Sequence, residues 1–144
     1  MHPVDRQDVY DPQMMGENAA RVTQHMLNTE RYFVPNPIYM TNQSDINEKM
    51  RSILIDWMVE VHLKFKLLPE TLYLKINLLD RYLEKSQTQR TQLQLVGVTA
   101  MMIAAKYEEI YAPEVKDYVW ITDKAFSKPE ILKKEYDVLM TLDF

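Results

Sequence analysis

Apolar and polar residues follow a helical period along most of the chain, and one stretch is apolar on every side. Between residues 95 and 105 the only polar side chain is Thr99. A helix without a polar face is normally buried all round, so residues 93–109 predict the central helix of a helical domain. Gly97 costs roughly 1 kcal/mol relative to alanine in a helix interior. Its presence indicates that a neighbouring helix approaches closely.

Four further helices are predicted around this central one, and capping signals mark their starts. A capping box places Ser, Thr or Asp three residues before Glu or Gln, and proline is favoured in the first turn of a helix. The starts predicted in this way are, in chain order, Asp45 with Glu48, Pro69, Thr91 with Gln94 (the central helix), Pro113, and Ser127 with Glu130.

The same patterns divide the chain into three parts. Residues 1–15 contain two prolines and few apolar side chains, which predicts a flexible lead. Residues 16–43 predict an ancillary, weakly amphipathic helix and then an extended connector, because Pro35 and Pro37 disfavour helix. No alternating strand pattern is visible, so residues 44–144 predict a compact all-α domain of five helices.

Composition narrows the classes of function. The net charge of -4 argues against a nucleic-acid-binding surface. The chain has no cysteine, only two glycines and three widely spaced histidines, so thiolate metal sites and a Gly-rich phosphate loop are excluded. We therefore expect no catalytic residues, no cofactor and no metal.

The apolar run of the central stretch is shorter than the ~20 residues that span a bilayer. The first fifteen residues lack the apolar core of a signal peptide. These two features predict an intracellular protein with no membrane association.

Charged residues inside apolar runs predict a buried ion pair. Arg51 and Asp80 both lie among residues that the pattern places in the core. A buried charge needs a partner, so we expect an ion pair between Arg51 and Asp80. The simplest role for this pair is to hold two helices in register.

Several motifs together resemble a known family. Residues 50–57 read MRSILIDW, which is similar to the MRAILIDW signature of A- and B-type cyclins. Similar motifs follow in the same order at residues 72–83, 93–97, 106–111, 113–115 and 121–123. The resemblance covers residues 45–144 and is greatest to mitotic B-type cyclins. It implies a five-helix N-terminal cyclin box with a central third helix. Relatives carry a second box, which we expect to be absent from this chain.

The resemblance also implies a function. Family members are regulatory subunits that bind and activate a cyclin-dependent serine/threonine protein kinase and control the G2/M transition, in the nucleus and cytoplasm. The kinase-facing residues of the family correspond here to Val22, Ile103, Lys106, Tyr107, Glu135 and Phe144. Such a mostly apolar patch with one cation and one carboxylate is typical of an interface core with orienting charges. The alternative for Lys106 and Glu135 is an ordinary surface salt bridge.

A second site is implied by the same signature. In relatives, a shallow apolar groove binds Arg-x-Leu motifs of substrates or inhibitors. Glu60 would meet the arginine of that motif. The alternative is that the groove residues belong mainly to the core and that Gln94 only completes a helix cap. The corresponding groove residues are Met50, Ile53, Leu54, Trp57, Glu60 and Gln94.

Two other classes of function compete with this interpretation. Transcription factor IIB and its relatives use cyclin-like boxes at promoters, although the acidic charge and the MRSILIDW motif disfavour that class. A helical scaffold for some other partner is the remaining alternative.

Overall fold

The computed structural model describes residues 3–144, and regular structure in this part of the chain is entirely helical. It consists of two units, the first ending at Val34 and the second beginning at Pro35. The first contains α1 (Pro3–Gln7), a 3-10 turn and α2 (Ala19–Glu30). The second contains α3 (Glu48–Phe65), α4 (Pro69–Lys85), α5 (Leu93–Glu108), α6 (Val115–Ile121) and α7 (Lys128–Thr141), with short 3-10 helices at Tyr39–Asn42 and Arg90–Gln92.

The N-terminal unit is thinly packed. None of the α2 residues is buried, in keeping with the weak amphipathic pattern of the sequence. Residues 1 and 2 of the predicted flexible lead lie outside the described residues, and the rest of the lead contains the one-turn helix α1. The flexibility of the lead stays a prediction.

The proline-containing connector belongs to the second unit, although the sequence grouped it with the N-terminal helix. Side-chain hydrogen bonds explain this attachment. The Gln43 amide donates to the carbonyl oxygens of Leu83 and Ser86, and the Asn36 backbone N–H donates to Glu84. These bonds hold the connector against the C-terminal end of α4.

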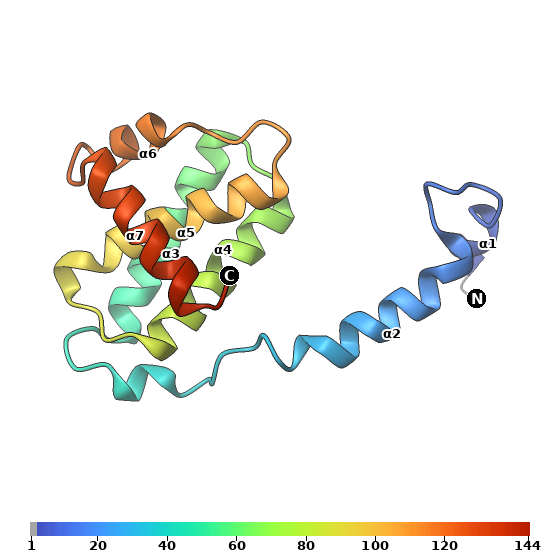
Figure 1. Cartoon of the computed structure of the whole chain (residues 1–144), viewed down its shortest axis with the longest axis horizontal. Coiled ribbons are helices and arrows are strands. Elements are labelled where there is room, and N and C mark those ends of the chain that lie inside the picture. Colours follow the sequence, from blue (N-terminus) through green and yellow to red (C-terminus); the bar gives the residue numbers. More distant parts are fainter. Residues whose placement is uncertain (1–2) are drawn as a thin grey trace. The chain divides into compact units, whose positions relative to one another are not determined.

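Helix α5 is the centre of the second unit, as predicted. Every residue from Leu95 to Ala105 is buried, and α3, α4, α6 and α7 all contact this helix (Figure 1). A Cβ atom at Gly97 would lie 2.9 Å from Leu54 Cδ1 of α3. The glycine is therefore explained by the close approach of α3 to α5.

Two predicted helix starts are correct. Pro69 lies in the first turn of α4. At the start of α7, the Ser127 backbone N–H and hydroxyl both donate to Glu130, which completes the capping box. Both signals lie within one helical turn of the sequence, so the local pattern is enough to predict them.

Three predicted start signals are wrong, although α5 begins at Leu93, the first residue of the predicted central stretch. Helix α3 is capped by Asn47, whose side chain accepts from the Met50 N–H, while Asp45 accepts from the backbone and side chain of Arg90. Because a 3-10 turn leads directly into α5, no Thr91–Gln94 capping box forms. Helix α6 begins after Pro113, at Val115, with a capping box between Glu114 and Asp117.

Within the described residues, no helix combines the length and the apolar character needed to cross a membrane.

Candidate functional sites at the two ends of the central helix

The C-terminal end of α5 emerges from the core at Lys106, beside α7. The Lys106 ammonium group forms an ion pair with the Glu135 carboxylate of α7. The lysine side chain is about half exposed, whereas the glutamate side chain is mostly covered. The pair therefore joins two helices at the surface and leaves the cation partly available to a partner.

Two exposed aromatic residues are among the other predicted kinase-facing residues of the second unit. Tyr107 is 76% exposed, and Phe144 at the end of the chain is also exposed, while Ile103 is buried one turn before Lys106. The Phe144 backbone N–H donates to the Leu139 carbonyl at 3.0 Å, which holds the last residue against α7. Val22 is exposed on α2, in the other unit. The predicted kinase-facing residues of the second unit thus combine two charges with exposed aromatic groups.

The N-terminal end of α5 borders a groove of about 540 Å³ on α3. Five of the six predicted groove residues line it, and Ile53 is 61% exposed, so this face of α3 is not simply core. Leu54 belongs both to the groove and to the core, because it lines the groove and is buried against α5. The lining consists of Met50, Ile53, Leu54, Trp57, Arg90, Thr91, Leu93 and Gln94.

The prediction differs from this lining in four residues. Glu60 is exposed on α3 and does not line the groove; it lies one helical turn beyond Trp57, where it could meet a ligand only past the end of the groove. Arg90, Thr91 and Leu93 were missed. Their nearness to Gln94 in sequence was the available signal, but the 3-10 turn that directs them to the groove was not predicted.

The predicted ion pair between Arg51 and Asp80 is present and is bidentate. Arg51 Nε and Nη2 donate to the two carboxylate oxygens of Asp80 at 2.6 and 2.7 Å. The Tyr39 hydroxyl also donates to Asp80, at 2.6 Å. Hydrogen bonding to Asp80 raises the pKa of Arg51, and burial followed by the bond to Asp80 raises the pKa of Tyr39. Tyr39 lies in the connector, so the sequence pattern did not reveal its part in this network.

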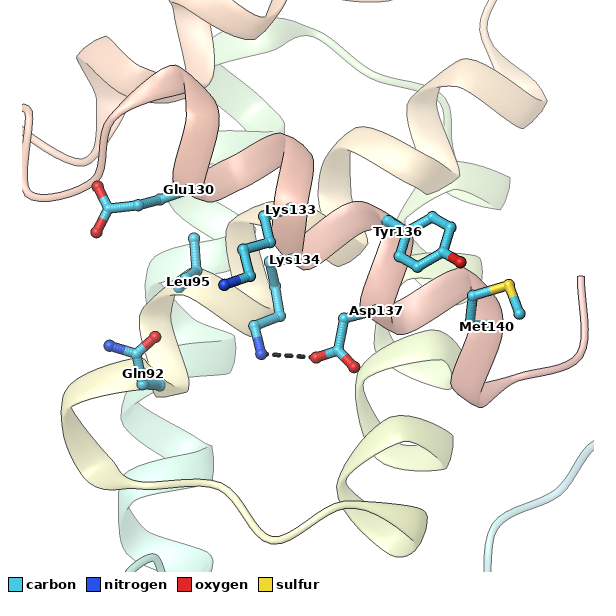
Figure 2. A pocket seen from close by; sticks show the side chains of 8 residues that line it. All are labelled: Gln92, Leu95, Glu130, Lys133, Lys134, Tyr136, Asp137 and Met140. Atoms are coloured by element: carbon cyan, nitrogen blue, oxygen red, sulfur yellow. Dashed lines mark hydrogen bonds and ion pairs between the residues drawn. The ribbon is translucent and has the colours of Figure 1, made fainter.

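A second cavity, of about 600 Å³, lies between the start of α5 and α7 and was not predicted. Lys134 and Asp137 of α7 face one another in Figure 2. The Lys134 ammonium group donates to Asp137 Oδ2 at 2.8 Å. The Tyr82 hydroxyl of α4 also donates to Asp137. Although burial opposes it, hydrogen bonding from Lys134 and Tyr82 lowers the pKa of Asp137. These polar groups satisfy one another.

Among residues 3–144, no cluster of histidine and carboxylate side chains has the arrangement of a metal site.

The chain belongs to the cyclin family. Residues 21–144 match the family model described as the cyclin N-terminal domain. The viral cyclin of herpesvirus saimiri, known from its X-ray structure, shares the fold with a TM-score of 0.78 at 24% identity, over 85% of this chain and 53% of that one. These findings confirm the predicted cyclin box.

Curated relatives refine this assignment to the mitotic cyclins. A G2/mitotic-specific cyclin-B from Marthasterias glacialis is 52% identical over 98% of this chain and 36% of the relative. The corresponding cyclin-B from Hydra viridissima is 48% identical over the same shares. Cyclin-B2-1 from Oryza sativa subsp. japonica is 47% identical over the whole chain and 34% of the relative. The chain thus spans about a third of the length of these relatives.

Proposed function

We propose that this chain binds and activates a cyclin-dependent serine/threonine protein kinase and so controls the G2/M transition. The observation that carries the proposal is the Lys106–Glu135 pair beside exposed Tyr107, at the positions that face the kinase in the family. The names of the relatives, G2/mitotic-specific cyclin-B, support the timing. The chain acts as a regulatory subunit, and the kinase supplies the catalytic residues.

Activation by such a subunit is a shift of population. The end of α5 and the face of α7 form a preformed surface because α5 is buried along most of its length. Docking on this surface stabilises the kinase conformation in which a mobile helix places its glutamate beside the ATP-binding lysine. Free energy for the shift comes from binding the active arrangement more tightly than the inactive one.

Charge reversal at Lys106 and Glu135 tests the proposal. The Lys106→Glu and Glu135→Lys variants should each abolish activation of a responsive kinase, measured by histone phosphorylation across a set of cyclin-dependent kinases. The double variant restores the ion pair within the chain but presents reversed charges to the kinase, so it should stay inactive. Full activation by a folded double variant would show that the pair is only an internal salt bridge.

We propose in addition that the groove on α3 binds Arg-x-Leu motifs of substrates or inhibitors. The apolar side chains of Met50, Ile53 and Trp57 suit the leucine, and Glu60 would attract the arginine from beyond the end of the groove. Trp57→Ala should lower the affinity for an Arg-x-Leu peptide about tenfold or more, because buried tryptophans are frequent hot spots. Unchanged peptide affinity in a folded Trp57→Ala chain would refute this assignment.

We also propose that the protein works in the nucleus and cytoplasm, which imaging of a fluorescent fusion would test. The similarity to cyclin-B does not favour the transcription-factor alternative. Retention of the chain on promoter DNA without any kinase would revive that alternative.

A further inference from the structure

The segment that joins α4 to α5 contains three Ser/Thr-Gln pairs within seven residues. Residues 86–92 read SQTQRTQ, so Ser86, Thr88 and Thr91 each precede a glutamine. One class of serine/threonine protein kinase selects glutamine directly after the residue that it phosphorylates. A short motif of this kind is informative only in a suitable structural context, and the three hydroxyl groups differ in how far the fold exposes them.

Two of the three hydroxyl groups are engaged by the fold. The Thr88 side chain is buried, and its hydroxyl donates to the Ser86 carbonyl oxygen. The Thr88 backbone N–H donates to the Gln43 side chain, which holds this part of the segment against the connector. The Ser86 hydroxyl belongs to a half-buried side chain and donates to the Tyr82 hydroxyl. A kinase could reach either oxygen only after the segment had separated from the domain.

Thr91 is the accessible residue of the three. Its side chain is exposed in the 3-10 helix Arg90–Gln92, and no hydrogen bond among the described residues uses its hydroxyl group. The glutamine that follows it, Gln92, is half-buried. A 3-10 helix of one turn opens easily because few hydrogen bonds hold it. The segment around Thr91 can therefore adopt the extended conformation in which kinases bind their targets.

A phosphate group on Thr91 would lie in the wall of the α3 groove. Thr91 lines that groove together with its neighbours Arg90 and Leu93. The phosphate carries a charge of about −1.5 to −2 at pH 7, and an apolar side chain that enters the groove would have to desolvate that charge. Arg90 donates to Asp45 through Nε, so both of its Nη groups remain to hold the phosphate in place.

We infer that Thr91 is a phosphorylation site for a kinase that selects glutamine after its target, and that phosphate on Thr91 blocks the binding of Arg-x-Leu motifs in the groove. The kinase transfers the γ-phosphoryl group of ATP. A bond forms between Thr91 Oγ1 and phosphorus, the bond from phosphorus to the ADP oxygen breaks, and the hydroxyl proton is released. The block rests on the proposed function of the groove, whereas the modification does not. Lys106 lies at the opposite end of α5, so activation of the cyclin-dependent kinase should persist.

Phosphorylation of the whole chain tests the modification. A purified kinase of this specificity should, with ATP, phosphorylate Thr91, as located by mass spectrometry of proteolytic fragments. Thr91→Val keeps the shape of the side chain without its hydroxyl and should abolish this phosphorylation, and so should Gln92→Glu. The matched control is Thr23→Val, which removes the exposed threonine of a further Thr-Gln pair on α2 and should leave Thr91 phosphorylated. Phosphate found elsewhere but not on Thr91, or no phosphate at all, would overturn the site.

Affinity for an Arg-x-Leu peptide tests the block. The phosphorylated chain should bind the peptide about tenfold more weakly, or worse, than the unmodified chain, and phosphatase treatment should restore the affinity. Activation of a responsive cyclin-dependent kinase towards a substrate without the motif should stay unchanged. Equal peptide affinity with and without phosphate would overturn the block, and so would loss of activation towards the motif-free substrate, because the phosphate would then disturb the whole domain.

Failure of the inference and failure of the proposed function can be told apart. If the unmodified chain does not bind the peptide, the groove assignment fails and the block is overturned with it. The mass spectrum still decides whether Thr91 is a phosphorylation site. If the unmodified chain binds the peptide and the phosphorylated chain binds it equally well, the groove assignment stands and only the block is overturned.

Discussion

Lys75 is a cation in the core of the domain. Its side chain is 0% exposed on α4, and its ammonium group donates to the Met58 carbonyl of α3 at 2.7 Å. Burial lowers the pKa of Lys75 to about 8. The neighbouring His62 is also buried, and its pKa is lowered by burial and then by the charge of Lys75. The folded state thus disfavours the charged form of Lys75.

The depressed pKa of Lys75 predicts that the contribution of this residue to stability rises with pH between about 8 and 10.5. Between pH 8 and 10.5 the unfolded chain binds more protons at this lysine than the folded chain, so unfolding becomes less favourable as pH rises. The full effect is about 3 kcal/mol, from the difference between the unfolded pKa of 10.5 and the folded pKa of about 8. Urea unfolding at several pH values measures it.

The matched variant is Lys75→Met, which has a similar volume and no charge. It should be more stable than the unchanged chain at pH 7, and this advantage should shrink towards pH 10.5. His62 is already neutral over that range because its pKa is lowered. A constant difference between the two proteins from pH 7 to 10.5 would contradict the prediction.

Asp80 carries two hydrogen-bonded partners, so its removal should be costly. Asp80→Ala leaves the Arg51 guanidinium partly buried without its carboxylate, and also leaves the Tyr39 hydroxyl without its acceptor. Breaking a buried pair in this way costs about 3 kcal/mol or more. Thermal and urea unfolding should both show the loss. Unchanged stability would mean that the pair contributes nothing to holding α3 against α4.

The sequence predicts the interactions of some buried polar residues but not those of others. Arg51 and Asp80 were predictable because each interrupts an apolar run, and a charge in such a place needs a partner. Tyr39 was not, because its bond to Asp80 spans 41 residues from a segment without helical pattern. Lys75 was missed although it lies among the buried residues of α4, since a single lysine in an amphipathic helix usually reaches solvent.

The contact between α3 and α5 links packing to the groove. Gly97→Ala would push its new Cβ against Leu54, whose side chain also lines the groove. Overpacking typically costs 1–3 kcal/mol, offset by roughly 1 kcal/mol of helix propensity. The net loss of stability should therefore be about 1 kcal/mol. Displacement of Leu54 should also lower the affinity for an Arg-x-Leu peptide.

A double-mutant cycle isolates this contact. The Gly97→Ala substitution should cost less in a Leu54→Ala background, because the atoms that it strikes are gone. Urea unfolding of the four proteins gives the coupling energy. Equal costs in both backgrounds would show that the strain lies elsewhere in α5.

The helix starts show which capping residues the local sequence can predict and which it cannot. The capping box of α7 was predictable because its partners are three residues apart. Asp45 has the same spacing to Glu48, yet its carboxylate bonds to Arg90, 45 residues away. The tertiary hydrogen bonds to Arg90 compete with a local helix cap at Asp45, and the local sequence does not show which of the two is more stable. The same bonds hold the 3-10 turn that completes the groove, so the missed groove residues share this cause.

At the scale of the whole second unit, one buried helix supports both proposed binding surfaces. Gln94 at one end of α5 lines the groove, and Lys106 at the other end pairs with Glu135 of α7. The two residues lie about 18 Å apart along the helix, at 1.5 Å per residue. On the proposed function, this separation would let a substrate motif and a kinase bind at the same time without competing for one side chain.

The separation predicts that the two surfaces can be damaged independently. Trp57→Ala should lower kcat/KM about tenfold for a substrate that carries an Arg-x-Leu motif, because that substrate loses its second attachment. It should leave kcat/KM unchanged for a substrate without the motif. Lys106→Glu should lower both, because the kinase itself is no longer activated. Phosphorylation of paired substrates by the same kinase measures the contrast. Equal losses for both substrates with Trp57→Ala would mean that the groove acts through the kinase surface, and that α5 couples its two ends instead of separating them.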